Sequence, residues 1–310
     1  MLRVLEPGLL ATIQDEGRPA AAHLGVPRSG ACDAWSMHIA NLLLSNEAGA
    51  AVLEMSLLGA TFEITMTGVI AIAGADMGAR IVEEDRPLAT GASHLVRAGT
   101  TLHFGPATRG VRTYLALPGG VDVGVVLGSR STCLAGGFGG LEGRPLMPGD
   151  RLDARADPMA PRAGRSWSAG GFDPTDPEAE VTVVAVPDAP GVHRDALDAL
   201  IARPWTVSPV GDRTGLRLEG EALPTSQAAD TLVSGGVMPG AIQVPPSGLP
   251  IVLLADAPTL GGYPVPAVVA RADLAIVAQR QSGVDLRFVA ITPEEARMAS
   301  AERRIGSALL

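Results

Sequence analysis

The sequence predicts a mainly β protein with a few helices, folded as two domains that are each built on a β-barrel or a β-sandwich. The first observation is length, because 310 residues exceed what one hydrophobic core ordinarily uses and favour two domains of about 150 residues. The second is that short apolar runs recur between turns, in a chain with 38 glycines and 25 prolines. The third is a weak similarity between the two halves of the chain, because each has an apolar strand followed by a glycine-rich polar loop with an Asp and an Arg nearby.

The first helix is expected to begin after Asp33, which is placed to cap its N-terminus. The side chains that follow at the spacing of one helical face are Trp35, His38, Ile39, Leu42 and Leu43. We interpret His38 as a packed core histidine, because a lone His on an apolar face is rarely a ligand. The helix is expected to end near residues 45–46.

Strands dominate the rest of the first half. The run Val52–Met55 and the alternation Phe62–Met66 predict a hairpin around Gly59. Glu54 lies inside an apolar strand, so we expect its carboxylate to meet an Arg or a substrate. Further strands are predicted at Val4–Ile13, broken by a Pro-Gly turn, and at Val69–Ala73, Leu102–Phe104 and Tyr114–Leu117.

The two domains are predicted at 1–153 and 181–310. The stretch 154–180 is rich in Pro, Gly, Ala and Asp without apolar periodicity, which predicts a linker or a long excursion between them. The terminal helix is predicted to start at Thr292, with Glu295 completing a capping box. The other elements expected in the second half are Val181–Val186, Trp205–Val207, Leu216–Leu218, Pro250–Ala255 and Asp285–Ile291 as strands and Arg194–Ala202 as a helix.

Composition excludes several functions. A formal charge of −9 argues against nucleic acid and anionic membrane as partners. All 24 basic residues are arginines, so the chain has no lysine to serve a P-loop, form a Schiff base or carry biotin. The five histidines show no metal-ligand spacing, and no metal site is expected. Without a secretory signal or an apolar run long enough to span a bilayer, we expect a soluble cytoplasmic protein.

One stretch of the second half concentrates polar groups. The apolar run Pro250–Ala255 reads as a strand buried on both faces, and Asp256 follows it directly. The paired Gly261 and Gly262 are expected to take positive φ values, which would let successive amides converge on an anion. Tyr263 precedes a proline, which restricts its backbone and the direction of its ring.

Five segments resemble a known family. They read GLLATIQDEGRPAAAHLGVPRSGACD, GVDVGVVLGSRST, GDRTGLRLEG, GAIQVPPSGLP and ADAPTLGGYP, at residues 8–33, 120–132, 211–220, 240–250 and 255–264. In this order they closely resemble the C subunit of bacterial ATP-dependent 5-oxoprolinase, a family also called allophanate hydrolase subunit 2 or the KipI antagonist. The family is similar to the C-terminal half of the carboxyltransferase domain of urea carboxylase.

The resemblance implies two cyclophilin-like β-barrels and a heteromeric complex. The implied activity is that of an amidohydrolase subunit, active only in the complex, in the ATP-dependent opening of 5-oxoproline to glutamate. The implied cofactor is ATP with magnesium in the complex, without covalent biotin on this chain. The implied partners are a KipI-like B subunit (allophanate hydrolase subunit 1), a LamB/YcsF-like A subunit and a small-molecule substrate.

Two departures from the family pattern lie beside the expected site. Residues 20–22 are three alanines where the family usually has Gly and an aromatic. Residues 257–259 are Ala-Pro-Thr where the family usually has Arg-Gln-Thr. Both bear on the substrate more than on the fold.

The candidate site residues come from polar loops near both ends of the chain, which we expect to face each other across one groove. Opening a lactam needs its carbonyl polarised and the developing negative charge stabilised, which arginines and backbone amides do in a dry cleft. Asp15 and Asp256 are candidate general bases or magnesium ligands, and Tyr263 is a third catalytic candidate. The substrate-binding candidates are Gln14, Arg18, Ser29, Arg130, Arg213, Gln243, Thr259, Gly261 and Gly262, the three arginines as anion clamps.

Other interpretations stay open at this point. Asp33 is read as a helix cap, and Cys32 at the helix start is weighed as a thiolate nucleophile, although no His-based relay is visible. The chain could instead be a carboxyltransferase component acting on urea or a similar amide with a separate biotin carrier. It could also be a non-catalytic regulator of a KipI-like subunit. A prolyl isomerase is suggested by the barrel alone, and fold does not imply function.

Overall fold

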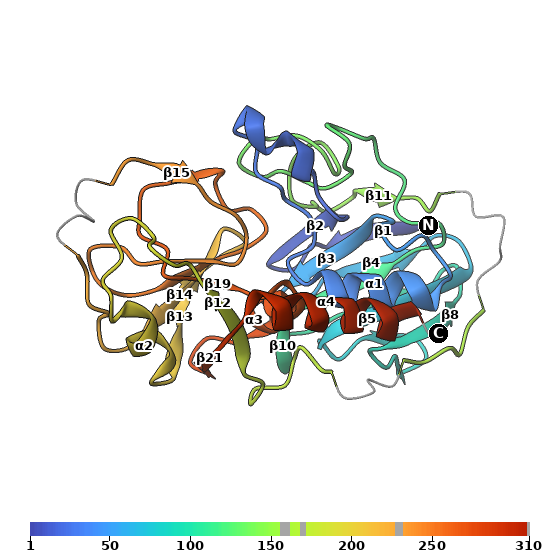
Figure 1. The fold of residues 1–310 in the computed structure, drawn as a ribbon. Coiled ribbons are helices and arrows are strands. Elements are labelled where there is room, and N and C mark those ends of the chain that lie inside the picture. The colour runs from blue at the N-terminus through green and yellow to red at the C-terminus, as the bar shows by residue number, and fades with distance from the viewer. Residues whose placement is uncertain (156–161, 168–171, 227–231, 309–310) are drawn as a thin grey trace. The chain divides into compact units, whose positions relative to one another are not determined.

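The computed structural model describes residues 1–155, 162–167, 172–226 and 232–308 (Figure 1). The chain divides into two compact units, Met1–Arg18 with Ser29–Thr175 and Pro19–Arg28 with Asp176–Leu309. Both units consist mainly of strands, which confirms the predicted class. The predicted boundaries at 153 and 181 stay a prediction, and residues 156–161 and 168–171 of the predicted linker lie outside the described residues.

The first unit contains two antiparallel sheets and a helix. The strands are β1 (Leu2–Glu6), β2 (Leu10–Gln14), β3 (Val52–Ser56), β4 (Thr61–Ile64), β5 (Gly68–Asp76), β6 (Arg80–Ile81), β7 (Arg86–Pro87), β8 (Ala92–Val96), β9 (Thr101–His103), β10 (Arg109–Ala116) and β11 (Arg151–Leu152), and the helix is α1 (Ala34–Leu43). The strand order is β11-β1-β4-β9-β6-β7 in one sheet and β2-β3-β10-β5-β8 in the other.

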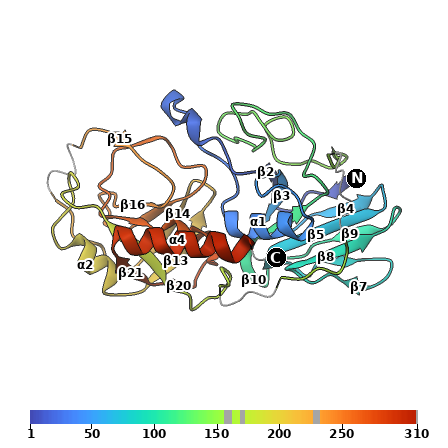
Figure 2. The same cartoon turned by 45° about the vertical axis from the view of Figure 1, so that its right-hand side comes forward.

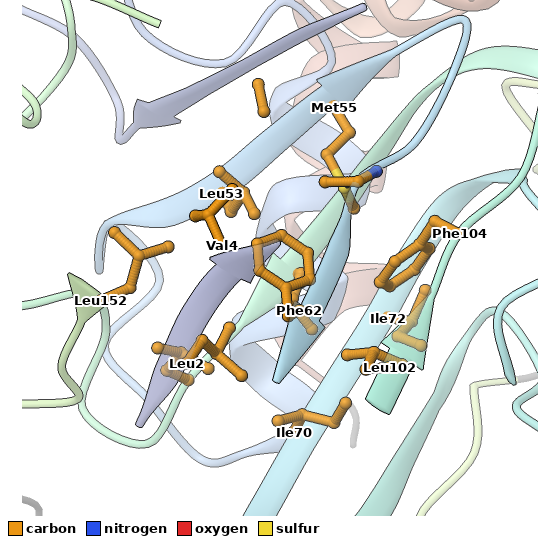
Figure 3. Packing of buried hydrophobic residues seen from close by; sticks show 14 of the residues in the cluster. Leu2, Val4, Leu53, Met55, Phe62, Ile70, Ile72, Leu102, Phe104 and Leu152 are labelled. Atoms are coloured by element: carbon orange, nitrogen blue, oxygen red, sulfur yellow. The ribbon is translucent and has the colours of Figure 1, made fainter. Parts of the chain in front are cut away.

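The core of the first unit lies between these two sheets (Figure 3). Alternation along β5 explains how one strand serves two layers, because successive side chains point to opposite faces. Ile70 and Ile72 join the core between the sheets, where the rings of Phe62 and Phe104 meet edge to face with centroids 6.4 Å apart. The intervening Ala71 packs with α1 on the other face. The predicted strand Val69–Ala73 is therefore confirmed as a strand buried on both faces.

The start of α1 confirms the predicted cap. The backbone N–H of Ser36 donates to Asp33 Oδ1 at 2.9 Å, and the Ser36 hydroxyl donates to Oδ2 at 2.5 Å. The helix ends at Leu43, two residues before the predicted position.

The buried face of α1 matches the predicted stripe in part. The buried apolar residues are Ile39 and Leu43, as predicted, together with Met37, Ala40 and the C-cap residue Leu44. His38 lies beside this face with its side chain 26% exposed, and its Nε2 lies 3.1 Å from Glu16 Oε1. The interpretation of His38 as a packed core histidine is therefore wrong, because the buried face of the helix lies one residue further toward the C-terminus than the predicted stripe.

The predicted hairpin around Gly59 is also wrong. Strand β3 pairs with β2 and β10, whereas β4 pairs with β1 and β9 in the other sheet. Leu53 and Phe62 both contribute to the core between the sheets, so the two strands face each other across it instead of pairing. The chain crosses between sheets at Gly59, where a Cβ would lie 2.2 Å from the Cβ of Phe104.

The second unit contains a single large sheet with helices around it. The strands are β12 (Val181–Ala185), β13 (Trp205–Gly211), β14 (Gly215–Glu219), β15 (Gly235–Gly236), β16 (Ala241–Gln243), β17 (Ile251–Leu253), β18 (Leu260–Gly261), β19 (Ala267–Val269), β20 (Asp285–Leu286) and β21 (Phe288–Ile291), and the helices are η1 (Pro19–Leu24), α2 (Ala196–Ile201), η3 (Arg271–Asp273), α3 (Leu274–Gln279) and α4 (Pro293–Ala308). The eight-stranded order is β20-β13-β14-β17-β16-β19-β12-β21, and β15 pairs with β18 in a separate two-stranded sheet.

The ends of the eight-stranded sheet show that it forms a nearly closed barrel. The predicted strand Asp285–Ile291 is split into β20 and β21, which occupy opposite ends of the strand order. Only Arg287 separates them, and one residue advances an extended chain by about 3.4 Å, so the two edges of the sheet must come together. Closure of this kind removes exposed sheet edges. A single strand was the wrong prediction here because closure bends the chain at Arg287.

The helices of the second unit follow local sequence signals. The capping box of α4 is confirmed, because Glu295 N–H donates to Thr292 Oγ1 at 3.2 Å and Thr292 N–H donates back to Glu295 Oε2 at 2.8 Å. This helix, drawn in red and labelled α4 in Figure 2, contacts η3 and β12. Helix α2 covers only the middle of the predicted Arg194–Ala202. No helix in the described part of the chain is long and apolar enough to cross a bilayer.

Candidate functional site

Gln14 is the last residue of β2 and joins the strand to the loop that precedes α1. It is completely buried, and its Nε2 donates to Thr12 Oγ1 at 2.9 Å. Its Oε1 accepts a hydrogen bond from the backbone N–H of Gly30 at 3.1 Å. Both ends of this side chain amide are therefore used to hold the loop against the sheet.

Asp15 is the centre of the polar network in the first unit. Its Oδ1 accepts hydrogen bonds from the hydroxyls of Ser129 (2.6 Å) and Ser131 (2.5 Å) and from the N–H of Gly17 (2.8 Å). Its Oδ2 accepts from the N–H of Arg130 at 2.6 Å. This carboxylate is only 8% exposed, and the four hydrogen bonds that it accepts offset the free energy cost of burying its charge.

Arg130 was predicted as a site residue, whereas the two serines that donate to the Asp15 carboxylate on either side of it were missed. Ser129 and Ser131 are among the buried polar residues, and the second also accepts from the N–H of Asp15 at 2.9 Å. The available signal was the alternation of hydroxyl residues on both sides of Arg130, which places both serines on one face of an extended segment.

Arg18 is buried and engaged within the same unit. Its Nη2 donates to the carbonyl oxygen of Ser131 at 2.5 Å, and its guanidinium lies 5.2 Å from the centre of the Phe138 ring. The glycine-rich segment Gly136–Gly140 covers it closely. A Cβ on Gly139, which has φ +72°, would lie 2.1 Å from the Ser131 oxygen. Close packing therefore explains the glycine at this position.

Ser29 carries a buried hydroxyl without a hydrogen-bond partner among the described residues. The side chain is 2% exposed, and Ser29 and Gly30 both have positive φ, +54° and +91°. A Cβ on Gly30 would lie 2.8 Å from the backbone nitrogen of Gly17, so the two loop segments touch through backbone alone. A strained backbone next to an unsatisfied buried hydroxyl is typical of a binding site.

Arg130 is half-buried and has no carboxylate partner in the part of the chain that the structure describes. Its Nε donates to the carbonyl oxygen of Val123 at 3.1 Å, and its backbone is held by Asp15 as described above. A guanidinium that is positioned in this way, and that forms no ion pair with a described carboxylate, suits the recognition of an anion or a polarised carbonyl.

A second buried network in the first unit surrounds Glu54. Its Oε2 accepts hydrogen bonds from the Tyr114 hydroxyl at 2.8 Å and from the N–H of Cys32 at 2.9 Å, and its Oε1 lies 3.9 Å from Nε of Arg112. The Tyr114 oxygen in turn accepts from the N–H of Asp33 at 2.8 Å. The expectation that Glu54 meets an arginine is confirmed.

Tyr114 was not predicted as a site residue, although it is one of only two tyrosines in the chain. It lies directly opposite Glu54 in the pairing of β10 with β3. Burial raises the pKa of its phenol well above the ordinary value, and the negative charge of Glu54 raises it further.

This raised pKa predicts alkaline instability. The folded state holds the Tyr114 proton more tightly than the unfolded state, so the contribution to stability is complete below the unfolded pKa of about 10 and is lost as the pH rises toward the folded pKa. We expect the free energy of unfolding to fall by about 1.4 kcal/mol per pH unit in that range. Urea unfolding across the range will measure it, without interference from lysines because the chain has none.

The matched control for this prediction is Tyr114→Phe. The variant should be less stable than the wild type at neutral pH, because it leaves Glu54 and the N–H of Asp33 each short of one hydrogen bond. Its stability should decline less steeply above pH 10. An equal slope in both proteins would show that another group controls alkaline unfolding.

In the second unit, Arg213 and Asp256 form a bidentate ion pair. Nε of Arg213 lies 2.8 Å from Oδ2 and Nη2 lies 3.1 Å from Oδ1, and the two side chains are 3% and 11% exposed. The backbone also connects them, because Asp256 N–H donates to the Arg213 carbonyl oxygen at 2.9 Å. The predicted anion clamp therefore already holds an anion, the predicted catalytic carboxylate.

Gln243 and Gly261 are also in contact. The Gln243 side chain is buried, its Nε2 has no hydrogen-bond partner among the described residues, and a Cβ on Gly261 would lie 2.3 Å from that nitrogen. The expectation of positive φ at Gly261 and Gly262 is wrong, because neither has one. Gly261 pairs with β15 as part of β18, and a Cβ at this position would force the Gln243 amide to move.

The remaining candidates lie beside this contact. The Thr259 carbonyl oxygen accepts a hydrogen bond from Val237 N–H at 3.1 Å, just before β18. Tyr263 is 44% exposed, and its hydroxyl makes no hydrogen bond to any described residue. The described residues contain no group of three or more His, Cys, Asp or Glu placed to hold a metal ion.

The structure thus assembles the predicted residues into one set in each unit. The first unit brings together Gln14, Asp15, Arg18, Ser29 and Arg130. The second unit joins Arg213 to Asp256, and Gln243 to Gly261. The expectation that the two sets face each other across one groove stays a prediction.

Comparison with known proteins places this arrangement in a family. The family model described as "Carboxyltransferase domain, subdomain A and B" matches residues 24–290. The chain belongs to the carboxyltransferase domain family. Within it, the chain is 37% identical to the C subunit of 5-oxoprolinase from Escherichia coli (strain K12), over 98% of this chain and 96% of that protein. It is 32% identical to the C subunit of 5-oxoprolinase from Haemophilus influenzae, over 96% of this chain and 93% of that protein.

Solved structures of carboxyltransferase domains agree with this fold. The crystal structure of Kluyveromyces lactis urea carboxylase matches with a TM-score of 0.87 and 27% identity. The match covers 99% of this chain but 29% of that one, so in urea carboxylase the same fold is one part of a longer chain.

The two departures from the family pattern lie in different surroundings in this carboxyltransferase domain. Residues 20–22, the three alanines, lie within η1 (Pro19–Leu24). Ala257 is 4% exposed and belongs to a small apolar cluster with Ala241 and Leu253. An arginine at position 257 would need a different local packing, so the substitution fits the buried environment.

Proposed function

We propose that this protein is the C subunit of an ATP-dependent complex that cleaves the lactam of 5-oxoproline to give glutamate. The observation that carries the proposal is the likeness to the C subunit of 5-oxoprolinase, which extends over nearly the full length of both chains. A likeness confined to one barrel would support the fold only, whereas this one includes both sets of candidate residues.

Each unit has its own candidate binding groups with unused hydrogen-bonding capacity. In the first unit these are the Ser29 hydroxyl and the Arg130 guanidinium. In the second unit they are the Gln243 amide and the Tyr263 hydroxyl. Cleavage of a lactam develops negative charge on its carbonyl oxygen, and donors of this kind stabilise such charge. Thr259 and Gly262 are proposed to shape the substrate pocket beside them.

Asp15 and Asp256 are better suited to positioning than to the magnesium or general-base roles suggested by the sequence. Asp15 already accepts four hydrogen bonds, and Asp256 is paired bidentately with Arg213. We propose that Asp15 positions Arg130 and that the Arg213–Asp256 pair positions the start of the 257–263 loop. Tyr263 remains the proposed proton-transfer residue, because its phenol is exposed.

The described residues do not fit a site for ATP with magnesium. The chain has no lysine, its acidic candidates are occupied, and the segment Gly136–Gly140 is packed on Arg18 and Ser131. We therefore propose that ATP and its magnesium ion bind to a partner, either the KipI-like B subunit or the LamB/YcsF-like A subunit. This chain would contribute to the binding of the lactam.

The test is an assay of 5-oxoproline-dependent ATP hydrolysis with the three purified subunits. We expect full activity with all three present and a loss of at least 100-fold when this chain is omitted, since a missing half-site removes several transition-state contacts. Activity that persists without this chain would overturn the proposal and favour a regulatory role. The variant Arg130→Gln should lower kcat more than it raises the KM for 5-oxoproline, because the guanidinium is proposed to stabilise charge that develops on the carbonyl oxygen during cleavage.

A carboxyltransferase reaction with urea or a similar amide is the second candidate. It is favoured by the family match and by the structural likeness to urea carboxylase. Because these 310 residues contain no lysine, biotin would have to be carried by another protein. Biotin-dependent carboxyl transfer in the presence of a separate carrier, without 5-oxoproline-dependent ATP hydrolysis, would favour this candidate.

A further inference from the structure

Four successive backbone amides lead from Ser29 to α1, and each donates a hydrogen bond to a buried residue. The N–H of Gly30 donates to Gln14 Oε1 at 3.1 Å, and the N–H of Ala31 donates to the carbonyl oxygen of Asp15 at 2.9 Å. Both acceptors lie at the end of β2. The first half of the segment 30–33 is therefore fixed to the sheet.

Glu54 and Tyr114 hold the second half of the segment 30–33. Glu54 Oε2 accepts from the N–H of Cys32 at 2.9 Å, and the Tyr114 oxygen accepts from the N–H of Asp33 at 2.8 Å. The Tyr114 hydroxyl donates to the same Oε2 at 2.8 Å, so one carboxylate oxygen holds both the phenol and an amide. The two side chains are 1% and 0% exposed and stand on paired positions of β3 and β10. Two strands of the sheet thus fix the segment.

A buried glutamate paired with a tyrosine is a costly choice for the sheet itself. Taking a carboxylate out of water costs free energy, and apolar side chains of similar volume would pack the two strands without that cost. Apolar side chains would, however, leave the N–H groups of Cys32 and Asp33 without these acceptors. The polar pair therefore serves the segment 30–33 more than the core of the sheet.

Ser29 directly precedes this segment and carries a group that the segment can present. Its hydroxyl is buried, at 2% exposure, and has no hydrogen-bond partner among the described residues. Ser29 and Gly30 both have positive φ, +54° and +91°, so the backbone that follows sets the direction of the hydroxyl. A donor that is held in advance loses less entropy on binding than a mobile one, and its position decides how well it serves catalysis.

We infer that Glu54 and Tyr114 are positioning residues, which fix the segment 30–33 and so direct the Ser29 hydroxyl at the carbonyl oxygen of the lactam. The inference rests on the proposed function, in which Ser29 is one of the binding groups. The carbonyl oxygen becomes more negative during cleavage, so a donor in a fixed position stabilises the transition state more than the bound lactam. Loss of this position should lower kcat and leave the KM for 5-oxoproline within about 2-fold.

A double-mutant cycle with Ser29→Ala and Tyr114→Phe tests the inference through 5-oxoproline-dependent ATP hydrolysis by the three-subunit complex. Ser29→Ala removes an unpaired hydroxyl, so it should keep the urea midpoint of this chain while lowering kcat by about 10-fold or more. Tyr114→Phe should lower kcat by about 5-fold or more when Ser29 is present. In the Ser29→Ala background, the same change should lower kcat by less than about 2-fold.

Thr113→Val is the matched control. Thr113 is buried and precedes Tyr114 on β10, so its side chain points to the opposite face of the strand, where its hydroxyl donates to the carbonyl oxygen of Ala75 at 2.6 Å. The variant should lower the urea midpoint, as Tyr114→Phe does, because it also loses a buried hydrogen bond. Its kcat should stay within about 2-fold of the wild type, with or without the Ser29 hydroxyl.

The two replacements of Glu54 give a second measurement. Glu54→Gln keeps an oxygen that can accept both hydrogen bonds of Oε2, whereas Glu54→Ala keeps neither. The glutamine variant should therefore retain about 5-fold more of the wild-type kcat than the alanine variant.

An equal loss of kcat from Tyr114→Phe with and without the Ser29 hydroxyl would overturn the inference and leave the proposed function intact. So would a wild-type kcat in Ser29→Ala, whether or not Tyr114→Phe folds. A loss in Thr113→Val as large as that in Tyr114→Phe would also overturn it, because both losses would then follow from destabilisation. A wild-type complex without 5-oxoproline-dependent ATP hydrolysis would overturn the proposed function and this inference together.

Discussion

Replacing Asp15 by asparagine is expected to lower the free energy of unfolding by about 3 kcal/mol. The carboxylate accepts from Ser129, Ser131, Gly17 and Arg130. An asparagine keeps one acceptor oxygen and turns the other position into a donor, which would face a hydrogen-bond donor. Two effects add to this cost. The asparagine NH2 group and the Arg130 N–H would face each other as two buried donors without an acceptor. The three hydrogen bonds to the remaining oxygen would become weaker, because that oxygen no longer carries a negative charge.

The same change should reduce the activity of the complex. Because Asp15 fixes the backbone of Arg130, the guanidinium would lose its defined position, and small misplacements of a binding group reduce catalysis strongly. We expect a loss of at least 10-fold in kcat/KM under conditions where the variant is folded. Urea unfolding and the ATP hydrolysis assay measure the two effects.

Asp76→Asn is the matched control for this variant. Asp76 accepts a hydrogen bond from Gly78 N–H at 2.9 Å, in the way that Asp15 accepts one from Gly17, but Asp76 is exposed and has no serine donors among the described residues. Its replacement should change stability by about 0.5 kcal/mol or less. If the two variants unfold at the same urea concentration, the network around Asp15 does not stabilise the fold.

Replacing Arg213 by glutamine is expected to destabilise the protein by about 3–5 kcal/mol. The substitution leaves the Asp256 carboxylate, which is 11% exposed, without its bidentate partner. An unpaired buried charge costs more than the ion pair contributes, so removal of both charges should be less harmful than removal of one. The double variant Arg213→Met with Asp256→Leu should therefore recover most of the lost stability in urea unfolding.

The double variant also separates structure from chemistry. If the ion pair only positions the loop that follows Asp256, a stable double variant should retain most of the activity. A double variant that is as stable as the wild type but inactive would contradict a positioning role. Arg194→Gln is the control for a surface ion pair, because Arg194 and Asp195 are 89% and 59% exposed. Its cost should be about 1 kcal/mol at most.

Local signals were the most reliable guides in the sequence. Asp33 and Thr292 cap their helices as predicted, because a cap depends on residues within one turn of each other. The run Val69–Ala73 is a strand with both faces buried, because its composition leaves no polar side for water.

The pairing of strands could not be predicted from such local signals. The strands on either side of Gly59 are apolar on alternate residues, and this pattern is identical for neighbours in one sheet and for strands that face each other across a core. Likewise, Asp285–Ile291 is uniformly strand-like, yet it supplies both edges of the barrel. His38 was misplaced because a helix of ten residues leaves the centre of its apolar face poorly defined.

For the candidate site, the sequence identified residue types but not their partners. Asp15 and Arg130 were recognised separately, and the structure shows that one fixes the other. Arg213 and Asp256, 43 positions apart, were assigned to different roles and are in fact paired. Gly261 was attributed to backbone freedom, whereas its φ is not positive and the notable contact is the close approach of the Gln243 amide.

The amino-acid sequence by itself determined the β class of this protein, its helix caps, its lack of lysine and the family to which it belongs. These properties depend on composition and on residues close together in the chain. Only the tertiary structure decided which polar side chains bond to each other and which remain available for a ligand. These hydrogen bonds and ion pairs form between segments that are distant in the sequence. Whether a buried polar group has a hydrogen-bond partner therefore depends on how those segments pack in the folded chain.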